Sequence, residues 1–220
     1  MKTVLISDTH LTPKFEKRKF AYLKNLFSKV DRIIINGDFW DGYLCSFREF
    51  TTSRWHRLFP ILKKKNAIYL FGNHDKKEWS DTNVNLFSSA QKHIFYLPFG
   101  NKELVIQHGN QIHKTFAERH PWLVNPLTTH FSIIALKLGV KIVGSNFYNF
   151  YYPRAIKTKQ RMQAWASERL TKEQILVCGH SHILSFEPEN QLVNTGFIQH
   201  GFGHYVLLTK EKINLIKERY

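Results

Sequence analysis

Short apolar runs alternate with amphipathic segments along the first third of the chain. Residues 2–6, 33–35 and 67–72 are apolar runs that predict buried strands. Between them, residues 20–30 and 47–62 carry apolar side chains at helical spacing. The candidate core positions of these two segments are Phe20, Leu23, Phe27, Val30, Phe47, Phe50, Leu58 and Phe59. Alternating strands and helices predict an α/β protein with a parallel sheet.

Further apolar runs follow in the second half of the chain. Residues 103–109 and 174–180 each end in a polar motif, and the tail from Gln191 onward reads as additional strands. We therefore expect residues 1–220 to form a single domain. A chain of this length can bury one sizeable core.

Residues 111–173 are predicted to be a helical insertion between two strands. The segment is not rich in Gly and Ser, so it does not resemble a flexible linker. Residues 131–144 are interpreted as a core helix, an apolar lid or a membrane-surface helix. The aromatic stretch 146–154 is interpreted as a packed corner, an interfacial belt or a base-stacking surface, and residues 157–170 as a second helix. We expect this insertion to act as a lid and to determine substrate specificity.

Composition narrows the classes of partner. The formal net charge of +15 favours phosphorylated substrates, an anionic membrane surface or, as second choice, nucleic acid. Cys45 and Cys178 lie far apart, which is typical of reduced thiols in a cytoplasmic protein. The N-terminal apolar run is too short for a signal peptide, and no run reaches the length of a membrane span. We expect a cytoplasmic protein that binds at most peripherally to the inner membrane face.

Five of the predicted strands end in a polar motif. The motifs are Asp8-x-His10, Gly37-Asp38-x-x-Asp41, Gly72-Asn73-His74-Asp75, His108-Gly109-Asn110 and Gly179-His180-Ser181-His182. Ligands of open α/β sheets bind beyond the carboxyl ends of the strands, so we expect the motifs to converge on one rim. The neighbouring glycines suit tight turns that present a side chain at close quarters.

That rim would gather oxygen and imidazole donors without a thiolate. The seven candidate metal ligands are Asp8, His10, Asp38, Asn73, His108, His180 and His182. This mixture suits Mn, Fe, Zn or Ni better than Ca or Mg. Seven ligands are too many for one tetrahedral metal site. They fit two metal ions that share a carboxylate, as in phosphatases and nucleases.

The order of the five motifs resembles that of the calcineurin-like metallophosphoesterases. The resemblance runs from Asp8 to His182, and the sequence VNTG at 193–196 is similar to the family's Asn-x-Gly. It implies an αββα sandwich, with two packed mixed sheets flanked by helices. It also implies two divalent metal ions, with Mn²⁺ as first choice and Fe, Zn or Ni as alternatives. One ion would be held by Asp8, His10, Asp38 and His182, and the other by Asp38, Asn73, His108 and His180.

The resemblance assigns roles to three further residues. His74 matches the catalytic histidine, which touches the phosphoryl oxygen or the leaving group. Asp75 would orient His74, and Asp41 matches an acidic position near the metals that is not a ligand. Among the other histidines, His113 and His200 are candidates to lie near the substrate.

The implied activity is metal-dependent hydrolysis of a phosphodiester or pyrophosphate bond. Within the superfamily, the chain is similar to the UDP-2,3-diacylglucosamine pyrophosphatases, peripheral membrane enzymes that cleave a lipid nucleotide. His74 stands where those enzymes usually carry arginine. A nuclease or nucleotide phosphodiesterase is the alternative, favoured by the positive charge and the aromatic residues. A non-catalytic scaffold on the same fold is a third reading.

Overall fold

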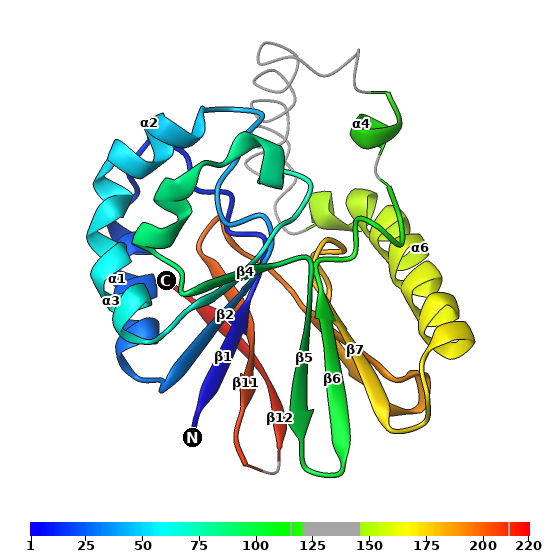
Figure 1. Cartoon of the computed structure of the whole chain (residues 1–220). Helices are drawn as coiled ribbons and strands as arrows, with labels where there is room; N and C mark the ends of the chain where they lie inside the picture. The colour runs from blue at the N-terminus through cyan, green and yellow to red at the C-terminus, as the bar shows by residue number, and fades with distance from the viewer. Residues whose placement is uncertain (115, 121–145, 211) are drawn as a thin grey trace.

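A computed structural model of the chain describes residues 1–114, 116–120, 146–210 and 212–220 (Figure 1). The strands are β1 (Thr3–Ile6), β2 (Arg32–Asn36), β3 (Ile68–Leu70), β4 (Ala90–Lys92), β5 (Ile94–Phe99), β6 (Lys102–Gln107), β7 (Gln174–Cys178), β8 (Leu184–Glu187), β9 (Leu192–Thr195), β10 (Ile198–Gln199), β11 (Phe202–Leu208) and β12 (Ile213–Arg219). The α-helices are α1 (Lys17–Ser28), α2 (Phe47–Thr52), α3 (Phe59–Lys64), α4 (Phe116–Arg119) and α6 (Asn146–Arg169). The 3₁₀ helices are η1 (Arg54–Leu58), η2 (Lys77–Trp79), η3 (Thr82–Leu86) and η5 (Pro188–Asn190).

The strands form two mixed sheets. The first has seven strands in the order β10-β11-β1-β2-β3-β4, with β12 paired to β11. Strands β1 to β4 run parallel, whereas β11 is antiparallel to β1. The second has five strands in the order β5-β6-β7-β9-β8, and its central strands β6, β7 and β9 run parallel.

The two sheets pack face to face, and helices cover their outer faces (Figure 1). Helices α1 and α3, with η1 between them in the chain, pack on the first sheet. Helix α6 packs on the outer face of the second sheet. The predicted αββα sandwich is therefore confirmed.

Central strands bury both of their faces. In β2, Ile33 and Ile35 pack beneath the helices, whereas Ile34 packs between the sheets. In β7, Leu176 lies beneath α6 and Val177 faces the first sheet. Because both faces are buried, these strands appear in the sequence as continuous apolar runs without polar alternation.

The helical segments differ in detail from the prediction. Residues 47–62 form three short helices, because Ser53 is extended and its hydroxyl accepts a hydrogen bond from the Trp55 N–H, which starts η1. The stretch 146–154 is no corner, since it forms the beginning of α6. The segment 131–144 lies outside the described residues. In the part of the chain that is described, no helix has both the length and the apolar character needed to cross a membrane.

One lysine of α1 is buried. Lys19 is 2% exposed, and its Nζ donates a hydrogen bond to the carbonyl of Thr9 at 2.5 Å. Burial lowers the pKa of Lys19 to about 8, and the charge of Glu16 offsets only part of this effect. Thr9 lies in the loop after β1, so Lys19 ties α1 to that loop.

Replacing Lys19 with methionine should remove a pH dependence of stability. The pKa of Lys19 falls from 10.5 to about 8 on folding, so the unfolded chain binds this proton more tightly. The free energy of unfolding should therefore rise between these two pH values, by up to about 3 kcal/mol. Urea unfolding at neutral pH and at about pH 10 measures this rise.

Lys24 is an exposed lysine on the same helix and provides the matched control. Lys24→Met should keep the rise in stability, and Lys19→Met should lose it. An equal rise in both variants would show that Lys19 does not titrate as a buried group.

Candidate metal centre

The five loops that carry the polar motifs meet where the two sheets adjoin. Backbone hydrogen bonds join them to one another. The Asp8 N–H donates to the Gly37 carbonyl at 3.1 Å, and the His10 N–H donates to the Asp38 carbonyl at 2.9 Å. In the second sheet, the N–H of residue 179 donates to the carbonyl of residue 108 at 2.9 Å. The motifs therefore share one rim that crosses both sheets.

Predicted ligands stand out by their backbone conformation. Within the described chain, eight non-glycine residues have positive φ. Five of them are predicted ligands, with φ between 44° and 61°: Asp8, His10, Asp38, His180 and His182. Each such residue costs about 1–3 kcal/mol and persists only where its surroundings hold it in place. This clustering of strain is typical of a functional site.

Two glycines allow the loops to approach one another closely. A Cβ atom on Gly37 would overlap the imidazole of His108, and one on Gly72 would overlap the carboxylate of Asp38. Gly37 also has a φ of 81°, which favours glycine. The motif glycines thus bring ligands of different loops into contact.

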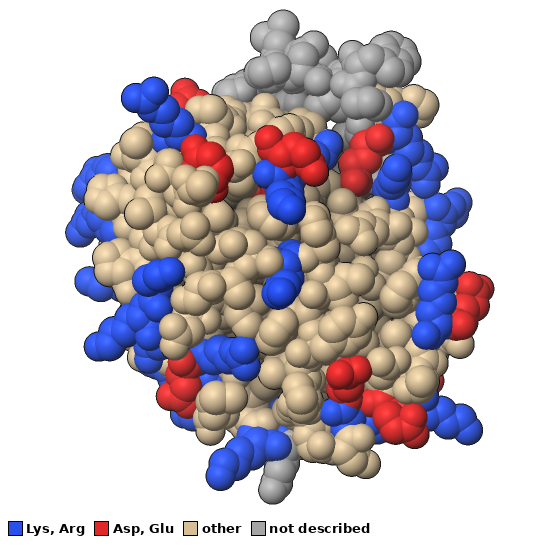
Figure 2. Space-filling model, in the orientation of Figure 1, with Lys and Arg blue, Asp and Glu red and all other residues tan. Residues whose placement is uncertain are grey.

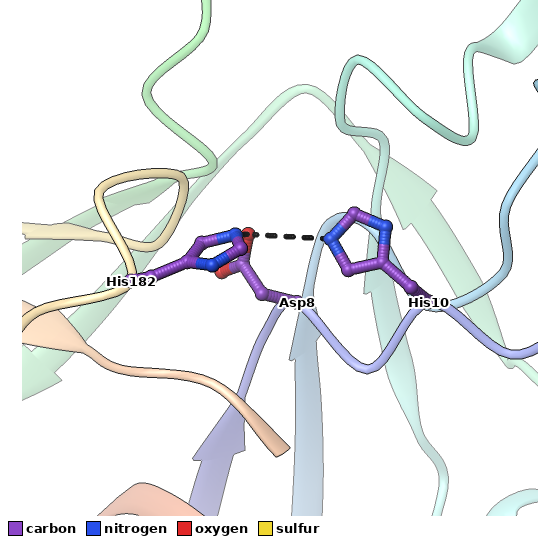
Figure 3. Close-up of side chains that lie close together, drawn as sticks. All are labelled: Asp8, His10 and His182. Carbon is purple, nitrogen blue, oxygen red and sulfur yellow. Dashed lines mark ion pairs between the residues drawn. The ribbon is translucent and has the colours of Figure 1, made fainter. Parts of the chain in front are cut away.

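Asp8, His10 and His182 form the first group of ligands (Figure 3). His182 Nε2 lies 3.1 Å from Asp8 Oδ1, and His10 Nε2 lies 4.0 Å from the same oxygen. Asp8 is fully buried, and its other oxygen accepts a hydrogen bond from the His180 N–H at 3.0 Å. The side chain of His182 is 46% exposed, so this group opens to solvent.

Asp38 and His108 form a second group beside the first. His108 Nε2 lies 3.2 Å from Asp38 Oδ2, and His10 Nε2 lies 3.7 Å from the same oxygen. His108 Nδ1 donates to the carbonyl of Asn36 at 2.8 Å. In the neutral ring, this hydrogen bond leaves the lone pair on Nε2, facing Asp38.

Asn73 and His180 complete the rim. Asn73 is 2% exposed, and its Oδ1 has no hydrogen-bond partner. The ring of His180 lies edge-on to that of His108, with 5.2 Å between the centroids. His180 Nε2 donates to the carbonyl of His113 at 2.8 Å, which leaves the lone pair on Nδ1.

Asp41 links the predicted catalytic histidine to a predicted ligand. His74 Nδ1 lies 3.1 Å from Asp41 Oδ1, and His10 Nδ1 lies 3.3 Å from Asp41 Oδ2. One buried carboxylate therefore orients both rings. Each ring then directs its Nε2 away from Asp41.

The structure corrects the expectation that Asp75 orients His74. The Asp75 carboxylate instead accepts hydrogen bonds from three backbone amides, of Asp38 at 3.0 Å, Phe39 at 2.7 Å and Gly72 at 2.6 Å. These amides belong to the loops after β2 and β3. Asp75 therefore holds two loops together, and the contact with His74 belongs to Asp41.

Buried negative charge dominates the electrostatics of the rim. Burial raises the pKa of Asp8, but His182 and His108 outweigh it and lower the pKa to about 2. Burial also acts against ionisation of Asp38, but chiefly His108 and His74 hold its pKa well below the ordinary value. Burial would lower the pKa of His108, yet Asp38 raises it to about 10. Without a cation, the protonated ring of His108 thus helps to keep both carboxylates ionised.

Four buried atoms of the candidate ligands form no hydrogen bond among the described residues, although Asp8 Oδ1 lies 3.1 Å from His182 Nε2 and His108 Nε2 lies 3.2 Å from Asp38 Oδ2 as ion pairs. They are Asp8 Oδ1, His10 Nε2, Asn73 Oδ1 and His108 Nε2. Unpaired buried polar atoms cost free energy and call for an explanation such as a bound ion. The donors are carboxylate, amide oxygen and imidazole, which suit divalent transition metals. The residues present therefore fit divalent cations.

The sequence pattern does not reveal Asn36 as part of the site. Its Nδ2 donates to the carbonyls of Gln107 at 3.1 Å and Val177 at 3.4 Å, in the opposite sheet. Asn36 is fully buried and also holds His108. The available signal was a polar residue at the end of a buried strand, directly before Gly37.

His113, a candidate for substrate contact, reaches the site through its main chain, because its carbonyl accepts a hydrogen bond from His180 Nε2.

Comparison with known proteins adds to this picture. A profile of the calcineurin-like phosphoesterases matches residues 1–206. No curated protein sequence matches the chain. The solved structure of YfcE, a phosphoesterase from E. coli, is 15% identical with a TM-score of 0.51, and the alignment covers 95% of this chain and 88% of YfcE. A single mutant of Vps29 from Entamoeba histolytica is 12% identical with a TM-score of 0.51, covering 100% of this chain and 99% of Vps29. At these identities, the two structures support the fold alone.

The family profile spans the whole rim. The matched residues include each predicted ligand from Asp8 to His182, together with His74 and Asp41. They also include strands of both sheets. The chain therefore belongs to the calcineurin-like phosphoesterase family.

Proposed function

We propose that the chain is a phosphoesterase that depends on two divalent metal ions and hydrolyses a phosphodiester or pyrophosphate bond. The observation that carries this proposal is the set of buried ligand atoms that gather at the rim without a hydrogen bond. Family membership supports phosphoester hydrolysis. A scaffold that binds no metal would gain nothing from keeping buried carboxylates and strained ligands.

Two sets of residues would hold the cations. One set is Asp8, His10, Asp38 and His182, and the other is Asp38, Asn73, His108 and His180. Divalent cations supply Lewis-acid polarisation of a phosphoryl oxygen and lower the pKa of water. Mn²⁺ is our first choice, with Fe, Zn or Ni as alternatives, because the donors are oxygens and imidazoles.

His74 is suited to donate a proton. Asp41 holds its Nδ1, so Nε2 is the nitrogen left for a substrate, and the side chain is 27% exposed. Burial lowers the pKa of His74, but Asp41 and Asp38 raise it to about 9, so the ring of the metal-free protein is protonated at neutral pH. His74 would hydrogen-bond to the phosphoryl group or protonate the leaving oxygen, and would not act as a general base.

Surface charge favours an anionic substrate. Four of the 17 acidic residues, Asp8, Asp38, Asp41 and Asp75, are at most 3% exposed, so the surface is more basic than the composition alone indicates. Figure 2 shows Lys and Arg spread around the margin of one face, with fewer acidic side chains between them. Such a surface would also approach anionic lipids readily.

Our leading substrate is a lipid nucleotide similar to UDP-2,3-diacylglucosamine, met in the cytoplasm at a membrane surface. Such a molecule combines a pyrophosphate with acyl chains, and the insertion at 111–173 combines basic with apolar and aromatic residues. A nucleotide or single-stranded nucleic acid is the second choice, because the same composition suits base stacking and phosphate contacts.

A substrate panel tests these assignments. The Mn²⁺-loaded protein is offered UDP-2,3-diacylglucosamine, cyclic nucleotides, single-stranded DNA and an aryl phosphodiester. We expect hydrolysis of the aryl ester and the highest kcat/KM for the lipid nucleotide, with UMP released. Preferred cleavage of DNA, with a steep salt dependence, would replace the lipid assignment by a nuclease. Absence of hydrolysis across the panel would overturn the enzymatic proposal.

His74→Ala should lower kcat on the aryl phosphodiester by roughly 100- to 10,000-fold at unchanged metal content. Asp41→Asn should move the alkaline limb of the pH–rate profile to lower pH. The reason is that Asp41 raises the pKa of His74, and the protonated ring is the active form. The exposed His56 on η1 gives the control, since His56→Ala should keep wild-type kcat. Full turnover by His74→Ala would rule out its catalytic role.

Metal affinity should rise with pH. The pKa of His108 is raised to about 10, so the ring is protonated at neutral pH and a cation at Nε2 must displace that proton. Each proton released should increase Mn²⁺ affinity by roughly tenfold per pH unit. Titration calorimetry in buffers of different ionisation enthalpy measures both quantities, and Asp38→Asn should weaken binding. Affinity that does not change with pH would contradict this account.

A further inference from the structure

We propose that Arg119, His113 and Thr158 are positioning residues for the metal ligand His180. They form a hydrogen-bond chain that ends on the His180 ring. This inference rests on the metal centre of the proposed function. His113 and Arg119 follow β6 and Thr158 lies in α6, so the chain connects both ends of the insertion 111–173 to the rim.

Donors and acceptors in this chain have only one consistent assignment. Arg119 can only donate, so His113 Nε2, at 3.3 Å from its guanidinium, is an acceptor. The proton of the neutral ring is then on Nδ1, which donates to Thr158 Oγ1 at 3.1 Å. The Thr158 hydroxyl in turn donates to the carbonyl of Arg154 at 3.0 Å. The position of His113 is thereby fixed from two sides.

The fixed main chain of His113 determines the tautomer of His180. A carbonyl can only accept, so the contact of 2.8 Å places the proton on His180 Nε2 and the lone pair on Nδ1. Metal-ligating histidines are commonly oriented by such a hydrogen bond from the other ring nitrogen. His180 also has a φ of 61°, so its backbone alone does not favour this position.

Helix α6 supports the neighbouring ligand loop as well. Met162 is fully buried, and a Cβ atom added to Gly109 would lie 2.5 Å from its Cε. The N–H groups of Ile112 and His113 donate to the Gly109 carbonyl at 3.0 and 3.1 Å. Gly109 directly follows His108, so both histidines of the second cation rest on α6 and the segment beside it.

This arrangement couples the insertion directly to one cation, whereas the other is linked to it only through the shared ligand Asp38 and through the His180 N–H that Asp8 accepts. Among the described residues, the side chains of Asp8, His10 and His182 form no hydrogen bond or ion pair with Arg119, His113 or Thr158. A ligand that stabilises the contacts between residues 109–113 and α6 should therefore strengthen binding of the second cation, and that cation should stabilise these contacts in return.

The test compares variants of the full-length protein. His113→Gly removes the anchor and loosens the backbone that carries the carbonyl, whereas His113→Asn can still bond to Thr158. Ser167→Ala, which removes an exposed hydroxyl elsewhere on α6, is the control. Calorimetry with Mn²⁺ measures each binding step, and imidazole ¹⁵N NMR of the metal-free protein reports the tautomer of His180.

We expect His180 to carry its proton on Nε2 in the wild type and to populate both tautomers in His113→Gly. One Mn²⁺ equivalent should bind His113→Gly roughly 10- to 100-fold more weakly, and the affinity for the other should change far less. His113→Asn and Ser167→Ala should bind both equivalents like the wild type. If His113→Gly does not fold, Thr158→Val tests the same chain.

Two results would overturn the inference. One is a proton on Nδ1 of His180 in the metal-free wild type, and the other is wild-type Mn²⁺ affinity for both equivalents in both His113→Gly and Thr158→Val. Neither readout requires a substrate. A protein that hydrolyses no phosphoester but shows the tautomer and affinity changes would refute the proposed activity and retain this inference.

Discussion

Two ionised carboxylates, Asp8 and Asp38, are buried where the sheets meet, and the surrounding structure is arranged to accommodate them. Burial of an unpaired charge costs several kcal/mol. Each carboxylate accepts a backbone N–H from another loop, Asp8 from His180 and Asp38 from His74. Imidazoles supply the remaining positive charge. The geometry of the loops follows from this requirement, including the left-handed backbone at Asp8 and Asp38.

Hydrogen bonds around these carboxylates also hold the two sheets and the neighbouring loops together. Asn36 bonds to two strands of the opposite sheet and holds His108, while Asp75 gathers amides from the loops after β2 and β3. A small shift of one sheet would therefore disturb ligands on both. Meanwhile, candidate ligand atoms such as Asn73 Oδ1 remain without a hydrogen bond. These candidate ligand atoms thus lower the stability of the folded protein, a cost that is common at functional sites.

The parts of this molecule that could be predicted from the sequence are those with a periodic or ordered signal. Central strands such as β2 bury both faces and appear as unbroken apolar runs. The short strand β4, Ala90–Lys92, carries no such signal, and the break at Ser53 depends on local capping. Asp75 is next to His74 in sequence, but the turn of the loop directs its carboxylate to amides, so chain adjacency was a poor guide to contact.

Main-chain contacts explain why other parts of the site could not be predicted. The group that fixes His180 is the carbonyl of His113, and every residue has a carbonyl. Only the tertiary fold decides which one faces the ring. The two groups of candidate metal ligands also differ in their exposure to solvent, which the residue types alone do not indicate. His182 is 46% exposed, whereas His108 is 1% exposed and lies beside α6. Solvent therefore reaches the first group more readily. The position of the second group depends on the packing of α6. In the proposed site, the exposed group would thus offer a position for an incoming substrate, and the affinity of the buried group would depend on the packing of α6.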